Sequence, residues 1–201
     1  MLRADQKIIA EVIEQGSKVI DIGCGQGSLL EYLEAEKGVS GHGLEIEADR
    51  VSAAVSKGLS VVQGDADNDL QYYSDKGFDY AILGQTLQIM KHPKEALEQA
   101  LRVAKRVVVV IPNFGYIQNR FYLLIKGRMP VTKELSYQWY ETPNIHFCTI
   151  KDFVYLAKEL GCNVERKSYV SKCGKEHKFS GDGTFASNLF GEYGIFVLSK
   201  D

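Results

Sequence analysis

The chain has 201 residues, of which 45% are hydrophobic and 25% are charged, so it can form one substantial hydrophobic core but hardly two independent ones. Its formal net charge of -2 at pH 7 provides no overall positive field that would attract nucleic acid or an anionic membrane surface. We therefore expect a single domain over residues 1–201 whose ligand is a small molecule, with neither a nucleic-acid nor a membrane partner.

The location and the thiol chemistry follow from what the sequence lacks. It has no apolar run of about 18 residues, and its first residues become charged at once, unlike a signal peptide, so a cytoplasmic location is expected. The four cysteines include no C-x-x-C pair, which argues against a disulfide framework and against a zinc site. The histidines and aspartates also lack metal-ligand spacing, and no metal site is predicted.

Helices and strands alternate through the first half of the chain. Apolar residues at helical spacing from Ile8 to Ile13 predict a first helix, and the run Lys18–Ile22 predicts the first strand. A glycine turn follows, and Leu29, Leu30 and Leu33 then restore the helical period. The alternation continues with a strand at 41–46, a helix at 48–57, strands at 59–63 and 78–83, a helix from 93 to 104, and a strand at 107–111 that is buried on both faces.

The second half departs from this alternation twice. Residues 113–145, which we call the 113–145 insertion, are too many for an ordinary connection, and residues 171–192 are expected to form a mobile loop or an irregular hairpin. Between them, Thr149 and Asp152 predict a capping box at the start of a helix that ends before Gly161. Strands at 162–170 and 193–199 have no room for a crossover helix between them and are expected to pair antiparallel.

These elements predict an α/β fold with a doubly wound sheet and helices on both faces. Seven strands are expected, mostly parallel, with an antiparallel last strand and with ligand sites at the carboxyl ends of the strands.

The turn Asp21-Ile22-Gly23-Cys24-Gly25-Gln26-Gly27 is the first candidate ligand site. Its alternating glycines allow a sharp turn and a close approach of ligand to backbone. The third glycine of a dinucleotide fingerprint would stand at position 28, which is Ser28. The spacing therefore does not match a dinucleotide site. It suits S-adenosylmethionine (SAM), which has no phosphate. The carboxylate of SAM can use the free N–H groups of the turn, and Asp21 can accept from its ammonium. Alternatively, the glycines serve the turn alone.

Two further acids follow successive predicted strands. Glu45 lies 18 positions beyond Gly27, near the offset of about 20 at which a carboxylate can bind both ribose hydroxyls. Asp65 is expected at the same sheet edge, where it can accept from an adenine amino group, with Ile46 and Ala66 on either side of the ring. Individually, Glu45 can be a solvated charge and Asp65 a turn former.

The chain resembles the methionine biosynthesis protein MetW family, a branch of the class I SAM-dependent methyltransferases, over nearly its full length. The stretches that carry the resemblance are 19–25, 62–65, 78–83, 85–88, 112–115 and, above all, Gly127-Arg128-Met129-Pro130-Val131-Thr132-Lys133, Trp139-Tyr140-Glu141-Thr142-Pro143-Asn144-Ile145-His146 and 148–150. Two features depart from the family: Gln26, where related turns often carry an acid, and residues 171–192, which do not align.

The resemblance implies a Rossmann-like methyltransferase fold and SAM as cofactor, with S-adenosylhomocysteine (SAH) as product. It also implies a link to methionine synthesis, where the family accompanies a homoserine O-acyltransferase. The residues implied in SAM contact are Gly23, Gly25, Gly27, Glu45 and Asp65, with Gln85 near the sulfonium.

The 113–145 insertion leaves the fifth strand at the ligand-bearing edge and is expected to form a lid. Its aromatic residues alternate with cations, and together they can bind an acidic substrate, contact a partner protein or pack as a satellite core. The aromatic residues are Phe114, Tyr116, Phe121, Tyr122, Tyr137, Trp139 and Tyr140, and the cations are Arg120, Lys126, Arg128 and Lys133.

Methyl transfer from a sulfonium is an in-line displacement that needs a base only if the acceptor must lose a proton. His146 is the first candidate for this base, followed by Tyr137 and Tyr140, although a histidine just before a helix cap can be purely structural. Two functions follow. One is a methyltransferase that acts on a small molecule, and the other is a non-catalytic SAM sensor that binds homoserine O-acyltransferase.

Overall fold

The computed structural model describes residues 2–132, 135, 137–182 and 185–200, so that Lys133 lies outside the described residues. The strands are β1 (Lys18–Ile22), β2 (Ser40–Glu45), β3 (Val61–Gln63), β4 (Phe78–Gly84), β5 (Ala104–Pro112), β6 (Asn163–Val170), β7 (Glu176–Lys178) and β8 (Tyr193–Ser199). The helices are α1 (Ala4–Val12), α2 (Ser28–Lys37), α3 (Ala48–Val55), α4 (Ala66–Asp69), α5 (Pro93–Val103), α6 (Ile117–Lys126), α7 (Ile150–Glu159) and α8 (Phe185–Phe190), with the short 3-10 turns η1 (Leu70–Tyr72) and η2 (Leu87–Ile89).

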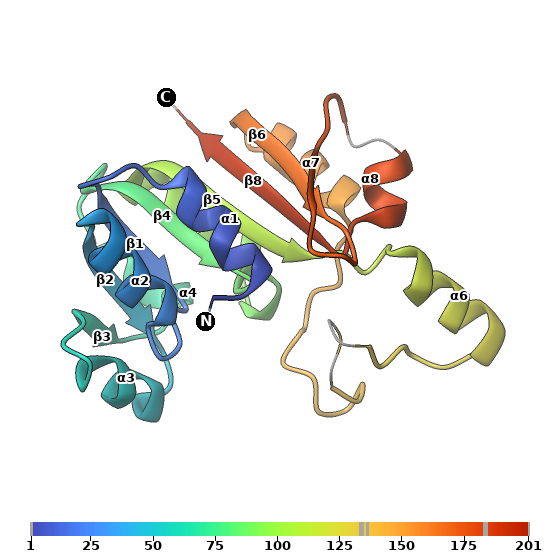
Figure 1. Cartoon of the computed structure of the whole chain (residues 1–201), viewed down its shortest axis with the longest axis horizontal. Helices are drawn as coiled ribbons and strands as arrows, with labels where there is room; N and C mark the ends of the chain where they lie inside the picture. The colour runs from blue at the N-terminus through green and yellow to red at the C-terminus, as the bar shows by residue number, and fades with distance from the viewer. Residues whose placement is uncertain (1, 133–134, 136, 183–184, 201) are drawn as a thin grey trace.

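The strands form one sheet in the order β3-β2-β1-β4-β5-β8-β6-β7 (Figure 1). Strands β1 to β5 pair in parallel, and β8 runs antiparallel to both β5 and β6. The predicted mostly parallel sheet with an antiparallel last strand is therefore confirmed.

The expected count of seven strands is wrong, because the sheet has eight strands within the described residues. The additional strand, β7, lies within residues 171–192 and pairs antiparallel with the end of β6. Side chains across the pair hold it: Arg166 Nη2 donates to Glu176 Oε1 at 2.6 Å, and the rings of Tyr169 and His177 stack at 5.1 Å. Three residues are too few to show the apolar alternation by which a strand is predicted.

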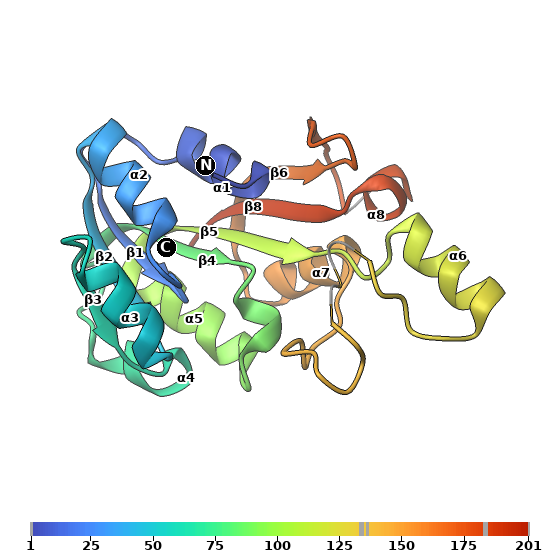
Figure 2. The same cartoon turned by 60° about the horizontal axis from the view of Figure 1, so that its bottom comes forward.

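The sheet is covered on both faces because alternate residues of its strands point in opposite directions. On one face, α1 and α2 pack against residues such as Val19, Ile82 and Val108. On the other face, α5 and α7 pack against residues such as Ala81 and Val107 (Figure 2). All residues of the predicted strand 107–111 are fully buried, as expected for a central strand with helices on both sides.

Some predicted element boundaries shift. Ala104, expected in the apolar stripe of a helix, is extended and begins β5 directly after α5. Because it is buried in the same core as the helix, its apolar character does not reveal the change of backbone. The helix predicted to reach Lys57 ends at Val55 and continues as a turn to Gly58, whose φ is 85°.

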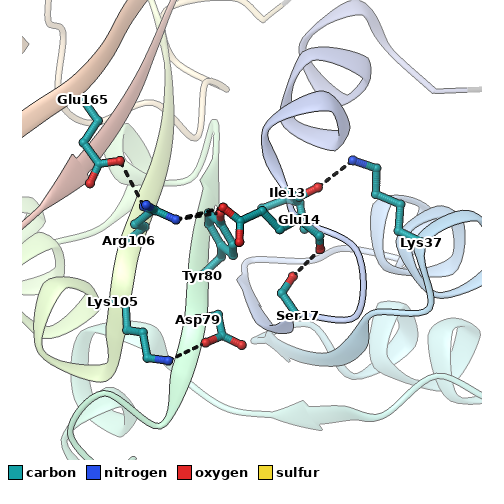
Figure 3. A network of polar contacts seen from close by, with 9 residues as sticks. All are labelled: Ile13, Glu14, Ser17, Lys37, Asp79, Tyr80, Lys105, Arg106 and Glu165. Carbon is teal, nitrogen blue, oxygen red and sulfur yellow. Dashed lines mark hydrogen bonds and ion pairs between the residues drawn. The ribbon is translucent and has the colours of Figure 1, made fainter.

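At the amino ends of the strands, a polar network fastens the elements together (Figure 3). Arg106 on β5 donates to Glu14 at 3.1 Å, to Glu165 at 3.0 Å and to the Tyr80 hydroxyl at 3.1 Å. Lys105 pairs with Asp79 at 2.8 Å. These charges pair with one another, and ion pairs this exposed contribute little to stability.

The 113–145 insertion begins where β5 ends at the ligand-bearing edge, and α6 extends away from the sheet (Figures 1 and 2). Most aromatic residues of the insertion do not form a satellite core. Tyr116 is buried, whereas Phe121, Tyr137, Trp139 and Tyr140 are more than half exposed. Among the described residues, no helix combines the length and the apolar character needed to cross a membrane.

Candidate functional site

A pocket of about 740 Å³ lies at the carboxyl ends of β1, β2, β3 and β4, within the usual size range of small-molecule sites. It is lined by most of the residues that the sequence predicted to bind the cofactor. Those that line it are Asp21, Gly23, Gly25, Glu45, Ile46, Asp65, Ala66 and Gln85, whereas Gly27 is not among its lining residues.

The three glycines of the turn have different surroundings, although all have positive φ. A Cβ at Gly23 would lie 2.5 Å from Thr86, and one at Gly27 would lie 2.3 Å from Leu59, so both are needed for packing. A Cβ at Gly25 would meet nothing within 4 Å. Gly25 therefore leaves space on the pocket side of the turn, while Gly27 serves the contact between the turn and the segment after α3.

Glu45 holds the turn in place. Its Oε2 accepts the Gly25 N–H at 2.7 Å, and its Oε1 accepts the N–H groups of Ile46 and Glu47 at 2.9 and 3.0 Å. The side chain is 4% exposed, so the alternative of a solvated strand-end charge is wrong. The Gly23 N–H in turn donates to the Leu44 carbonyl at 2.7 Å. Of the glycine N–H groups expected to bind a ligand carboxylate, those of Gly23 and Gly25 are thus bonded to β2, and that of Gly27 donates to the Cys24 carbonyl.

Asp21 is a buried acid beside the turn. Its burial raises its pKa to about 7, Arg3 opposes this rise, and the nearby charge of Glu45 adds to it. Two carboxyl groups that share a desolvated pocket wall favour a cation between them. Asp21 therefore has the electrostatic character of a receptor for a positively charged group.

Asp65 and Ile46 lie at the far end of the pocket. Asp65 caps α4: its Oδ1 accepts the Asp67 N–H at 3.0 Å, and its Oδ2 accepts from Asn68 at 2.9 Å. Asp65 is therefore a turn former, as the alternative interpretation held, and it also lines the pocket. Ile46 is 59% exposed, which leaves an apolar surface at the pocket mouth beside Ala66.

Gln85 follows β4 in a left-handed conformation with φ 65°, which is uncommon for a residue with a side chain. Its Nε2 donates to Asp5 Oδ2 at 2.8 Å, which joins the turn after β4 to α1. Its carbonyl accepts from Gln88 Nε2 at 2.6 Å. These contacts fix the segment that closes the pocket on the β4 side.

Sequence reasoning missed Arg3 and Asp5, which reach the site from α1. Arg3 lines the pocket, and Asp5, 3% exposed, accepts from it. An acid at the start of an amphipathic helix is ordinary, because it favours the helix dipole, so no sequence signal separated Asp5 from such residues.

The three candidate bases occupy different places. Tyr137 lines the pocket. His146 is exposed, and its backbone N–H donates to the Gln88 carbonyl at 3.0 Å, while the Tyr140 ring lies 5.6 Å from that of Trp139. His146 and Tyr140 are not among the lining residues.

Burial raises the pKa of the Cys24 thiol to about 12, which disfavours the thiolate that a nucleophile requires. Within the part of the chain that the structure describes, no group of three or more histidine, cysteine or acidic side chains is arranged to hold a metal ion.

The two glycines give a first prediction. Gly27→Ala should lower the free energy of unfolding by about 2–5 kcal/mol, because it adds a clash with Leu59 to the cost of a left-handed alanine. Gly25→Ala, the matched control, should cost only about 1–2 kcal/mol. Urea denaturation measures both, and equal losses would contradict this division of roles.

The buried carboxyl group of Asp21 gives a second prediction, which concerns the pH dependence of stability. The folded protein holds a proton on Asp21 up to about pH 7, whereas the unfolded chain releases it near pH 4, so its contribution to stability is lost as the pH rises between these values. Asp21→Asn should therefore be more stable than wild type at pH 8, by up to about 4 kcal/mol. The gap should close below about pH 4. A gap that does not change with pH in urea denaturation would contradict the buried charge.

Solved structures of known proteins share this fold. A SAM-dependent methyltransferase from Thermotoga maritima is 18% identical, with a TM-score of 0.69 over 98% of this chain and 88% of that chain. The [4+2]-cyclase SpnF is also 18% identical, with a TM-score of 0.67 over 97% of this chain and 80% of that chain. At these identities the likeness shows the fold, which is the Rossmann-like fold of class I SAM-dependent methyltransferases.

Sequence relatives show the family. The bifunctional methionine biosynthesis protein MetXA/MetW of Rhodopirellula baltica is 32% identical in an alignment of 177 residues that covers 84% of this chain. The chain spans only 28% of that longer protein. Residues 3–198 match the family described as methionine biosynthesis protein MetW. The chain therefore belongs to the methionine biosynthesis protein MetW family.

Proposed function

We propose that this chain binds SAM in the pocket beside the glycine turn and transfers its methyl group to a small-molecule acceptor, in connection with methionine biosynthesis. The observation that carries the proposal is the pair of buried carboxyl groups, Asp21 and Glu45, on either side of the Gly25 turn. A phosphate-bearing dinucleotide fits less well, because Asp21 places a buried acid beside the turn on which its pyrophosphate would lie.

The chemistry of the lining supports SAM group by group. Asp21 receives the ammonium, because a cation there relieves the cost of its buried charge. Glu45 accepts from a ribose hydroxyl with the lone pair of Oε2 that is left after its three backbone contacts. Asp65 accepts from the adenine amino group, and Ile46 and Ala66 contact the ring.

When bound, SAM supplies an electrophilic methyl group on a sulfonium. The chain contributes orientation: the turn and Glu45 fix the nucleoside, and Gln85 lies on the wall nearest the reacting end. We assign Tyr137 to the acceptor side, because it brings a hydroxyl from the 113–145 insertion to the pocket. Tyr140 and His146 are further candidates to take a proton from an acceptor that requires it.

Binding of SAH to the ligand-free protein tests the cofactor. Because the ammonium favours ionised Asp21, the affinity should rise with pH through about 7 and be roughly tenfold weaker at pH 6 than at pH 8. Asp21→Asn should bind at least about tenfold more weakly and lose this dependence. Isothermal titration measures both quantities.

Asp65→Asn is the matched control, since it removes an acid at the adenine end and should keep the wild-type pH dependence. No SAH binding to the wild-type protein at any pH from 6 to 8 would overturn the cofactor proposal. A screen for transfer of a tritiated methyl group to metabolite fractions then tests turnover.

A second function, a SAM-responsive partner of homoserine O-acyltransferase, is favoured by α6. Three consecutive apolar or aromatic residues there are exposed by a third or more, and the following two, Leu124 and Ile125, by 79% and 72%. A continuous exposed apolar surface marks interaction sites. The relative MetXA/MetW carries its MetW stretch and a MetXA stretch in one protein, as its name states.

Leu124→Glu with Ile125→Glu tests this function. The doubly substituted chain should no longer co-purify with homoserine O-acyltransferase, while its SAH affinity should stay within about twofold of wild type, since neither residue lines the pocket. Tyr72→Glu, at another residue that is 80% exposed, is the control and should leave the complex intact. If homoserine O-acyltransferase does not co-purify with the wild-type chain, with or without SAM, this function is excluded.

A further inference from the structure

The N-cap and first half of α1 line one side of the pocket, through Arg3, Gln6 and Ile9. Asp5 lies behind this wall and is 3% exposed. Its carboxylate accepts from Arg3 Nε at 3.1 Å, from Arg3 Nη2 at 3.0 Å and from Gln85 Nε2 at 2.8 Å. One buried acid thus orients two side chains of the same pocket wall.

The contact with Asp5 fixes the Arg3 side chain without using all its donors. A guanidinium has five N–H groups, and two of its nitrogens face Asp5, which leaves the Nη1 edge free to meet a ligand. The Arg3 side chain is 57% exposed although its partner is buried. Asp5 therefore holds Arg3 at the pocket rather than neutralising it deep in the core.

The pocket requires a cation at this position if its ligand carries a carboxylate. The N–H groups of Gly23 and Gly25 are bonded to β2, and Asp21 and Glu45 present negative charge. Of the other cations of the lining, Arg50 on α3 is paired with Glu47 at 2.9 Å, and Lys91 lies beside Asp67, to which its backbone N–H donates at 3.0 Å. Arg3 is the arginine whose charge acts on Asp21, so the two residues together complement a zwitterion.

We propose that Arg3 binds the carboxylate of the amino-acid part of SAM and that Asp5 is the residue that positions it. This inference rests on the proposed binding of SAM in this pocket. The ammonium then meets Asp21 and the carboxylate meets Arg3, so the wall between β1 and α1 recognises the α-amino acid end of the ligand.

The test compares SAH with its analogue in which hydrogen replaces the carboxylate. Wild type should bind the analogue roughly 10- to 100-fold more weakly than SAH, the loss expected for a charge-assisted contact. Arg3→Gln should bind SAH about as weakly as wild type binds the analogue, and it should distinguish the two ligands by less than about threefold. Isothermal titration gives all four constants.

Arg50→Gln is the matched control: it also removes an arginine of the lining and should keep the wild-type ratio between the two ligands. Asp5→Asn should lower that ratio while the protein remains folded by circular dichroism, and Asp5→Glu should recover part of it. A merely structural role of Asp5 would weaken both ligands equally and leave the ratio unchanged.

The outcomes separate this inference from the proposed function. If wild type binds neither ligand, the binding of SAM itself fails. If wild type binds SAH and Arg3→Gln keeps the full preference for the carboxylate, the assignment of Arg3 is overturned. The same holds if Arg3→Gln leaves SAH binding intact and impairs only an acidic methyl acceptor, because Arg3 then serves the acceptor's carboxylate.

Discussion

The hydrogen bond from the Gly25 N–H to Glu45 Oε2, 2.7 Å long, ties the turn after β1 to the end of β2. Because both oxygens of Glu45 are held by backbone N–H groups, its carboxylate is an organised part of the backbone turn. The turn can then leave β1 sharply, place Gly25 against open space and start α2 at Ser28. The pocket and its acidic wall both depend on this arrangement.

The acidic wall is costly to the free protein. Asp21 is nearly inaccessible, and its desolvation together with the charge of Glu45 outweighs the help it receives from Arg3. Such a cost persists where function requires it, since a group that is unfavourable alone becomes favourable when its ligand arrives. The same reasoning applies to Gln85, which follows β4 with a φ of 65° and is held at the pocket by its contacts with Asp5 and Gln88. Gln88 also accepts the backbone N–H groups of Ile145 and His146, so the wall is continuous with the end of the 113–145 insertion.

Much of this could be predicted from the sequence. Apolar runs such as Val107–Ile111 predicted the strands of an α/β sheet, and the spacing of Glu45 and Asp65 predicted that acids meet at one edge, because parallel strands end together. Contacts that depend on distant pairing could not be predicted. The short strand β7 has no periodicity, the positive φ of Gln85 leaves no trace in residue type, and Asp5 meets Gln85 across 80 positions. The different roles of Gly25 and Gly27 follow from Leu59, which the sequence does not place beside the turn.

The central claim is that the buried carboxyl group of Asp21 binds the positively charged group of the ligand. Titration of its carboxyl carbon by nuclear magnetic resonance, in the free protein and with SAH bound, measures this directly. The account predicts a pKa of about 7 in the free protein and a fall of more than about two units with SAH, since the ammonium stabilises the carboxylate. A pKa near 4 in the free protein, or one that SAH leaves unchanged, would contradict it.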